Sequence, residues 1–75
     1  AVDVKIVMRE AIVAGASAMM LFHNHPSGNR DISQPDIALT RRICDAAKIM
    51  DIQVLDHIIF CGDSIYSFHD EGKMP

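Results

Sequence analysis

The apolar run Ser-Ala-Met-Met-Leu-Phe at residues 17–22 is the feature that most limits what this chain can fold into. The run is too short for a helix of its own, and an unbroken apolar stretch of this length is typical of a strand buried on both faces. Residues 3–14 before it carry apolar side chains at helical spacing, with Asp3 at the positive end of the helix and Gly15 placed to stop it. The sequence therefore predicts a helix followed by a strand.

A second helix and further strands follow. Residues 33–36, Ser-Gln-Pro-Asp, have the form of a helix start, with a serine N-cap, a proline in the first turn and an acid three residues on. Residues 52–60 read as one long strand or as two strands with a kink, residues 61–64 as a turn, and residues 65–68 as a half-buried strand before a loose tail. In the second helix we expect a buried face of Leu39, Ile43, Ala46, Ala47 and Met50, and a solvent face of Thr40, Arg41, Asp45 and Lys48.

The order helix, strand, helix, strand, strand indicates an α/β fold in which helices cover a sheet. A chain of 75 residues forms a single domain, residues 1–75, with a small core. Three strands make a thin sheet, and an exposed sheet edge is a liability. We therefore expect the chain to be part of a larger domain or to complete its sheet by pairing with another copy, as a homo-oligomer.

Composition and charge restrict the classes of function. The chain is 49% hydrophobic and 23% charged, which is typical of a globular protein. No apolar run approaches the roughly 20 residues that span a bilayer, and the start lacks the form of a signal peptide, so a cytoplasmic location without membrane contact is expected. A formal net charge of −3 gives no support for binding to nucleic acid. Cys44 and Cys61 match no metal or redox motif and are expected to be reduced, mostly buried thiols.

Two histidines, His23 and His25, follow the apolar run and are separated by one residue. Alternate side chains of an extended chain point to the same face, so both rings could reach one ion. Asp36, eleven residues past His25, could supply a third ligand from the start of the next helix. Two imidazoles and a carboxylate, with a position left for water, are the ligand set of a catalytic zinc site, and non-haem Fe(II) sites use the same set.

Each of these residues also has a purely structural explanation. Asp36 can be the acidic partner of a capping box with Ser33, without any metal. Imidazoles in turns often bond to backbone carbonyls, and Pro26 and Gly28 are ordinary turn residues. The residues alone therefore leave the metal site and the structural reading open.

The other two histidines have weaker claims to a function. His57 directly follows Asp56, and neighbours in an extended segment face opposite sides, so we expect a structural histidine bonded to backbone rather than a catalytic dyad. His69 lies beside Asp70 and Glu71, where a solvated turn explains it.

The segments His-Asn-His-Pro-Ser-Gly at 23–28 and Ser-Gln-Pro-Asp at 33–36 together resemble the JAMM signature of the JAB/MPN metalloproteases, His-x-His-Pro followed by Ser-x-x-Asp. The surrounding sequences REAIVAGASAMMLFHNHPSG and LDHIIFCGDSIYSFHDEG are similar to the bacterial RadC branch of that superfamily, and the resemblance covers essentially the whole chain. It implies a cytidine-deaminase-like, three-layer α/β fold. Because the sequence starts at the first helix, we expect the domain to lack its N-terminal strands and to be partial.

Carried over to this chain, the resemblance implies that His23, His25 and Asp36 bind Zn²⁺. Ser33 matches the serine that stabilises the oxyanion in peptidase relatives. Pro26, Ser27 and Gly28 would shape the ligand loop and take no part in the chemistry. The implied function is that of a zinc-dependent metallohydrolase, a peptidase or isopeptidase that acts on amide bonds.

One part of that catalytic set has no match. Peptidase relatives place a general-base glutamate on a strand well upstream of the histidines. The upstream acids of this chain, Asp3 and Glu10, fall in the helical segment, and Glu10 is expected to be a surface residue. The alternative is therefore a catalytically degenerate RadC-like module with a structural or protein-interaction role. The family is also often labelled as a DNA-repair family, a label that the acidic charge does not support.

Overall fold

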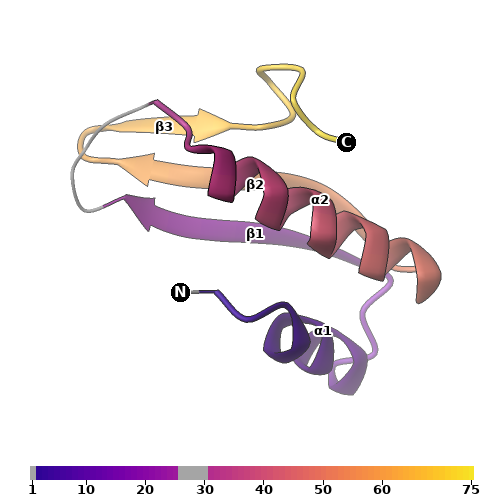
Figure 1. Cartoon of the computed structure of the whole chain (residues 1–75). Coiled ribbons are helices and arrows are strands. Elements are labelled where there is room, and N and C mark those ends of the chain that lie inside the picture. Colours follow the sequence, from indigo (N-terminus) through magenta and orange to yellow (C-terminus); the bar gives the residue numbers. More distant parts are fainter. Residues whose placement is uncertain (1, 26–30) are drawn as a thin grey trace.

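The computed structural model describes residues 2–25 and 31–75. Their elements are, in order, α1 (Val4–Val13), β1 (Ala18–His25), α2 (Gln34–Ile49), β2 (Gln53–Cys61) and β3 (Ser64–Ser67). The three strands form one mixed sheet in which β2 is central, parallel to β1 and antiparallel to β3. Figure 1 shows α2 lying across the sheet and α1 near β1. The expected α/β class is confirmed, and neither described helix is long and apolar enough to cross a membrane.

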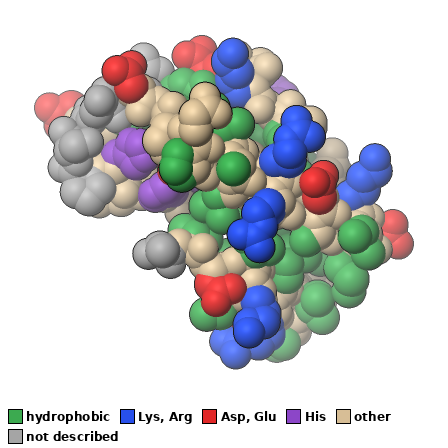
Figure 2. All heavy atoms as spheres, viewed as in Figure 1, with side chains coloured by type: hydrophobic (Ala, Val, Ile, Leu, Met, Phe, Trp, Pro, Cys, Tyr) green, Lys and Arg blue, Asp and Glu red, His purple; other side chains and the backbone are tan. Residues whose placement is uncertain are grey.

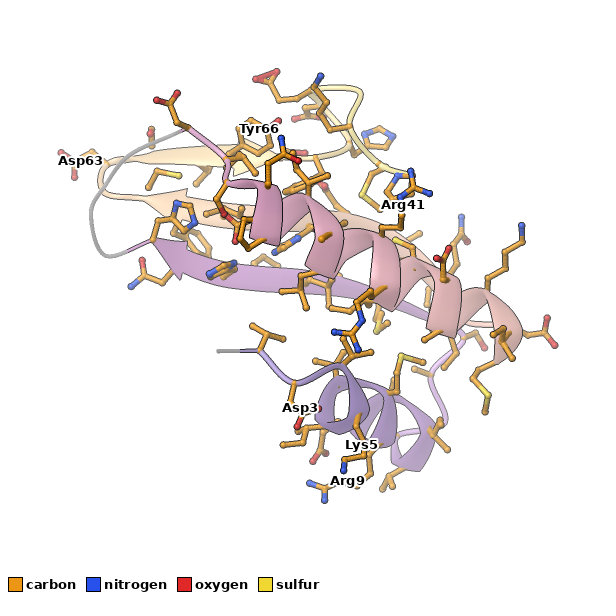
Figure 3. All side chains as sticks on the ribbon, in the orientation of Figure 1. Asp3, Lys5, Arg9, Arg41, Asp63 and Tyr66 are labelled. Atoms are coloured by element: carbon orange, nitrogen blue, oxygen red, sulfur yellow. The ribbon has the colours of Figure 1, made fainter. Side chains whose placement is uncertain are left out.

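Both helices begin at a side chain that caps free backbone N–H groups. Asp3, at the start of α1 in Figure 3, accepts a hydrogen bond of 2.9 Å from the backbone N–H of Lys5. Ser33 precedes α2 and forms a capping box with Asp36. Gly15 follows α1 with a φ of +66°, a left-handed conformation that glycine adopts at little cost. The Ser33 cap and the stop at Gly15 are the ones expected from the sequence, which predicted for Asp3 only a charge at the start of the helix.

One face of α2 packs on the sheet. Ile43 and Ala47 are almost completely buried there, as expected. Two predictions for this helix were wrong. Thr40 was expected in water but is fully buried, because it lies over β2 and bonds to His57. Met50 was expected in the core but is 49% exposed, because it lies just beyond the last helical residue.

The described helices cover only one face of the sheet. The half-buried residues on the covered side of β1 are Met19, Leu21, His23 and His25. On the opposite side Met20 is 44% and Phe22 is 62% exposed. Phe60 and Ile65 extend this apolar face, and the rings of Phe22 and Phe60 stack at 6.0 Å. The prediction that residues 17–22 are buried on both faces is therefore wrong for the part of the chain that the structure describes.

The central strand β2 is continuous, so the segment expected at residues 52–60 forms one strand rather than two, with bounds of Gln53–Cys61. Its register against β1 is irregular, because Met19 pairs with Val54 and Met20 pairs with Asp56. Leu55 is thus the extra residue of a β-bulge, and a one-residue shift sends each later side chain to the other face.

Asp56 joins β2 to β3 and to the chain beyond it. The residue is 9% exposed, and its carboxylate accepts hydrogen bonds from the Ser67 hydroxyl at 2.5 Å, the His57 backbone N–H at 2.7 Å and the His69 backbone N–H at 2.9 Å. Burial raises the pKa of Asp56, but these hydrogen bonds more than offset burial and hold the pKa below its ordinary value. Asp56 is therefore an ionised anchor of the sheet.

The change Asp56→Asn should lower the free energy of unfolding at pH 7 by about 1.5–3 kcal/mol, the range for hydrogen bonds to a charged group. Because the pKa of Asp56 is lowered on folding, the stabilisation is complete above the unfolded-state pKa of about 3.9 and is lost as the pH falls through the folded-state pKa. Urea denaturation at pH 7 and pH 3 measures this difference between wild type and variant, which should shrink at pH 3.

Asp70→Asn provides the matched control, because the Asp70 side chain is 83% exposed. This variant should unfold like the wild type at pH 7. An Asp56→Asn difference of equal size at both pH values would contradict the assigned role of the charge.

Candidate metal centre

The end of β1 and the first turn of α2 bring together three side chains that can bind a metal. His23 and His25 lie on the helix-covered side of β1, and Asp36 lies in the first turn of α2. One ligand atom from each residue can be chosen so that all three lie within 4.8 Å of one another. The expectation that both histidines point to the same face is confirmed. The strand is longer than the predicted run and includes both of them.

The distances within this group suit one small cation. His25 Nε2 lies 3.0 Å from Asp36 Oδ2, and His23 Nδ1 lies 3.7 Å from Asp36 Oδ1. In a tetrahedral zinc site with bonds of about 2.0–2.1 Å, neighbouring donor atoms are roughly 3.3 Å apart. The two histidine–carboxylate distances, which end on different oxygens of Asp36, bracket that value.

The Nδ1 atom of His23 provides an independent test of whether a metal fits. This atom is buried and has no hydrogen-bond partner among the described residues. A buried polar atom without a partner costs about 1–3 kcal/mol, and a cation held between it and Asp36 would remove that cost. The side chains of His23 and His25 are still 23% and 17% exposed, and Figure 2 shows histidine side chains at the molecular surface. The donor set therefore fits a metal ion that solvent can reach.

The helix cap holds the carboxylate of Asp36 in place. The Ser33 hydroxyl donates to Asp36 Oδ2 at 2.7 Å, and the Ser33 backbone N–H donates to the same oxygen at 3.2 Å. Burial raises the pKa of Asp36, but these two hydrogen bonds, together with His25, more than offset burial and lower the pKa. The capping box and the metal ligand, which the sequence left as alternatives, are thus compatible in one ionised side chain.

Ser33 has both sides of its hydroxyl occupied in this arrangement. The single hydroxyl proton goes to Asp36 Oδ2, while the oxygen accepts the Asp36 backbone N–H at 3.2 Å. To donate to a substrate oxygen, the hydroxyl must first turn away from the carboxylate. The backbone N–H of Ser33 would continue to hold Asp36 after that turn.

Sequence reasoning missed two buried polar residues beside the site, Thr40 and His57. The Thr40 hydroxyl donates to the Asp36 carbonyl oxygen at 2.9 Å and lies 2.7 Å from His57 Nδ1. The ring of His57 also stacks on the ring of His23, with centroids 5.8 Å apart. The spacing of four residues between Asp36 and Thr40, which puts both on one helix face, was the available signal.

The hydrogen-bond partner of the His57 ring differs from the one expected. Its ring bonds to the Thr40 side chain rather than to backbone. It forms no dyad with Asp56, as expected, because that carboxylate binds the His57 backbone N–H instead. Burial lowers the pKa of His57 and His23 adds to this effect, while Asp36 and Asp56 act in the opposite direction.

Two other candidates lie apart from the metal-binding group. Glu10 is exposed on α1 and its carboxylate lies 3.2 Å from the Arg9 guanidinium, so it is the surface residue that was expected. The side chain of His69 is 72% exposed and lies 3.5 Å from the Asp70 carboxylate, which agrees with a solvated turn.

Cys44 is half-buried, Cys61 is buried, and both are free thiols, as expected. The turn residues Pro26, Ser27 and Gly28 lie outside the described residues.

A surface hollow of about 690 Å³ opens directly beside the metal-binding group. His23 and Asp36 form part of its lining. The remaining lining residues are Val2, Asn24, Pro35, Ala38, Leu39 and Arg42. The hollow is therefore lined by both apolar and polar side chains, among them the cationic Arg42 and the carboxylate of Asp36, and it opens next to the donor atoms.

Comparison with known proteins identifies the family of this chain. The family model of the RadC-like JAB domain matches residues 1–73. A UPF0758 protein of Flavobacterium johnsoniae is 44% identical over 71 residues, which is 95% of this chain and 31% of that protein. UPF0758 protein Tgr7_0100 of Thioalkalivibrio sulfidiphilus is 47% identical over 68 residues, 91% of this chain and 30% of that protein.

A UPF0758 protein of Thiobacillus denitrificans is 46% identical over 68 residues, again 91% of this chain and 30% of that protein. The chain thus spans less than a third of the length of these curated relatives. Because the family model matches nearly the whole chain, and relatives align along nine-tenths of it, the chain belongs to the RadC-like JAB domain family.

Proposed function

We propose that this chain carries the metal centre of a zinc-dependent hydrolase that cleaves peptide or isopeptide amide bonds. The observation that carries the proposal is the meeting of His23, His25 and Asp36 within 4.8 Å, with a buried ring nitrogen of His23 that has no hydrogen-bond partner among the described residues. Two imidazoles and one carboxylate leave a fourth zinc position open, which is typical of catalytic rather than structural sites. Membership of the RadC-like JAB domain family supports an amide substrate, and the hollow beside the donors offers room for one.

His23, His25 and Asp36 would hold the ion, and a zinc ion there would lower the pKa of a coordinated water to about 7, supplying a nucleophile at neutral pH. Residues of the chain would bind the substrate and stabilise the oxyanion. The hollow beside His23 and Asp36 would hold the substrate next to the donors. The Ser33 hydroxyl, once turned from Asp36, would donate to the oxygen that gains negative charge when the carbonyl is attacked.

The general base would come from elsewhere. Glu10 is paired with Arg9 on the exposed side of α1, and among the described residues the metal-binding group includes no carboxylate besides Asp36. We therefore assign the role of general base to none of the described residues. We do not propose a DNA substrate, because the net charge is −3 and Figure 2 shows Lys and Arg side chains interspersed with acidic ones.

The first test is metal content. Protein purified without a histidine tag should contain about one zinc per chain, measured by elemental analysis, and alanine at His23 or His25 should abolish binding because two donors are too few to hold the ion. His69→Ala is the matched control, since it removes an exposed histidine outside the group and should bind zinc like the wild type. Absence of stoichiometric zinc after zinc loading, with the protein folded, would contradict the proposal.

The second test is the role of Ser33 in hydrolysis. With the zinc-loaded full-length protein and a panel of fluorogenic peptides and isopeptides, Ser33→Ala should lower kcat by about 10²–10³-fold with little change in KM, because one oxyanion donor is lost. Ser33→Thr keeps both the hydroxyl and the helix cap and should retain most of the activity. Thermal melting of each variant separates loss of the cap from loss of catalysis.

The outcomes separate the hydrolase from its alternative. Equal kcat values for Ser33→Ala and the wild type would remove Ser33 from the chemistry while leaving the metal centre intact. A full-length protein that binds one zinc per chain but cleaves no peptide or isopeptide amide would favour the degenerate module with a structural or protein-interaction role.

A further inference from the structure

A column of three stacked rings crosses the sheet next to the metal-binding group. The ring of His57 lies between the ring of His23, at a centroid distance of 5.8 Å and an interplanar angle of 14°, and the ring of Phe68, at 4.8 Å and 11°. His57 is 2% exposed and Phe68 is fully buried. Close packing in such an interior leaves these rings little room to turn. The column therefore fixes the plane of the His23 ring from one side.

Thr40 ties this column to α2. Its hydroxyl donates to the carbonyl oxygen of Asp36, one helical turn earlier, at 2.9 Å, and lies 2.7 Å from Nδ1 of His57. A hydroxyl has one proton, so donation to Asp36 leaves its oxygen to accept the N–H of His57. Thr40 is completely buried, so water has no access to replace either bond.

The β-bulge in β2 places His57 in this position. Val54 packs against the core under the helices. Regular alternation from there would put Asp56 on the helix side and His57 on the opposite side. The extra residue at Leu55 reverses both, so that His57 lies opposite Leu21 and reaches α2. The bulge at Leu55 thus allows His57 of β2 to bond to the buried Thr40 of α2.

We propose that Thr40 and His57 form a positioning pair that sets the placement of Asp36, the donor from α2, relative to His23, one of the two donors from β1. Thr40 binds the backbone carbonyl of Asp36, and the ring of His57 stacks on the ring of His23. One hydrogen bond joins Thr40 to His57. This role rests on the proposed metal centre. Loss of contacts that orient metal ligands typically weakens metal binding about 10–100-fold.

The test compares metal binding by variants that keep the shape of the pair but remove its hydrogen bond. Thr40→Val is nearly isosteric and loses the hydroxyl, and His57→Phe keeps a stacking ring and loses the N–H. Each should weaken zinc binding about 10–100-fold in competition with a chromophoric chelator, and each should alter the visible spectrum of the Co²⁺-loaded protein. Thr40→Ser, which keeps the hydroxyl, should restore both readouts to near wild type.

A double variant and a distant control complete the design. Both single changes remove the hydrogen bond between Thr40 and His57. The double variant Thr40→Val, His57→Phe should therefore have a zinc affinity no lower than that of the single variant with the lower affinity. Ile52→Ala removes buried core volume in the cluster around Ala47 and should lower the melting temperature without changing zinc affinity.

The results distinguish this role from the metal centre itself. A wild-type protein that binds zinc, with both single variants equal to it in affinity and Co²⁺ spectrum, would overturn the positioning pair alone. Additive losses in the double variant, or an equal loss in Ile52→Ala, would also overturn it. A wild-type protein that binds no zinc would overturn the proposed function and this role with it.

Discussion

The carboxylate of Asp36 is the point on which the site depends. Its Oδ2 atom accepts the hydroxyl and backbone N–H of Ser33 and lies 3.0 Å from His25, while its Oδ1 atom faces His23 at 3.7 Å. The same contacts that begin α2 therefore aim a charged oxygen at two imidazoles on a different element. Without this cap the helix would lose its defined start and the histidines would lose their common partner.

The fold supplies the rigid frame that this carboxylate needs. The sheet positions both histidines at the end of β1, and α2 crosses the sheet so that its first turn reaches them. One turn further along α2, Thr40 bonds to His57 and so connects the helix to the central strand. The ring of His57 stacks on that of His23. The donors thus come from two elements that are fixed to one another by buried contacts. The opposite sheet face, with Phe22 and Phe60, takes no part in the site.

Much of this arrangement follows from local sequence rules. The alternation of an extended chain puts His23 and His25 on one face, and Ser33 with Asp36 defines a helix start from four consecutive residues. The JAMM resemblance then implied that His23, His25 and Asp36 are the metal ligands, and the family model confirms the RadC branch. These features were predictable because each depends on residues close together in the chain.

The features that sequence reasoning missed depend on distant contacts. Thr40 is polar and directly precedes Arg41 and Arg42, and only the position of β2 shows that it is buried. His57 reaches α2 because of a bulge at Leu55 that no turn or glycine signal marks. The exposed side of the run at 17–22 was also missed, since an unbroken apolar sequence does not reveal which of its two faces the described helices cover.

X-ray absorption at the zinc edge tests the central claim most directly, because it reports the ligands of the ion itself. The full-length protein loaded with one zinc should show only nitrogen and oxygen neighbours at about 2.0–2.1 Å, with the outer scattering of two imidazoles. Cys61 pairs with His25 in the register of the sheet, so the experiment also checks for a thiolate ligand from β2. A sulfur neighbour at about 2.3 Å, or a bound zinc with no imidazole scattering, would contradict the account.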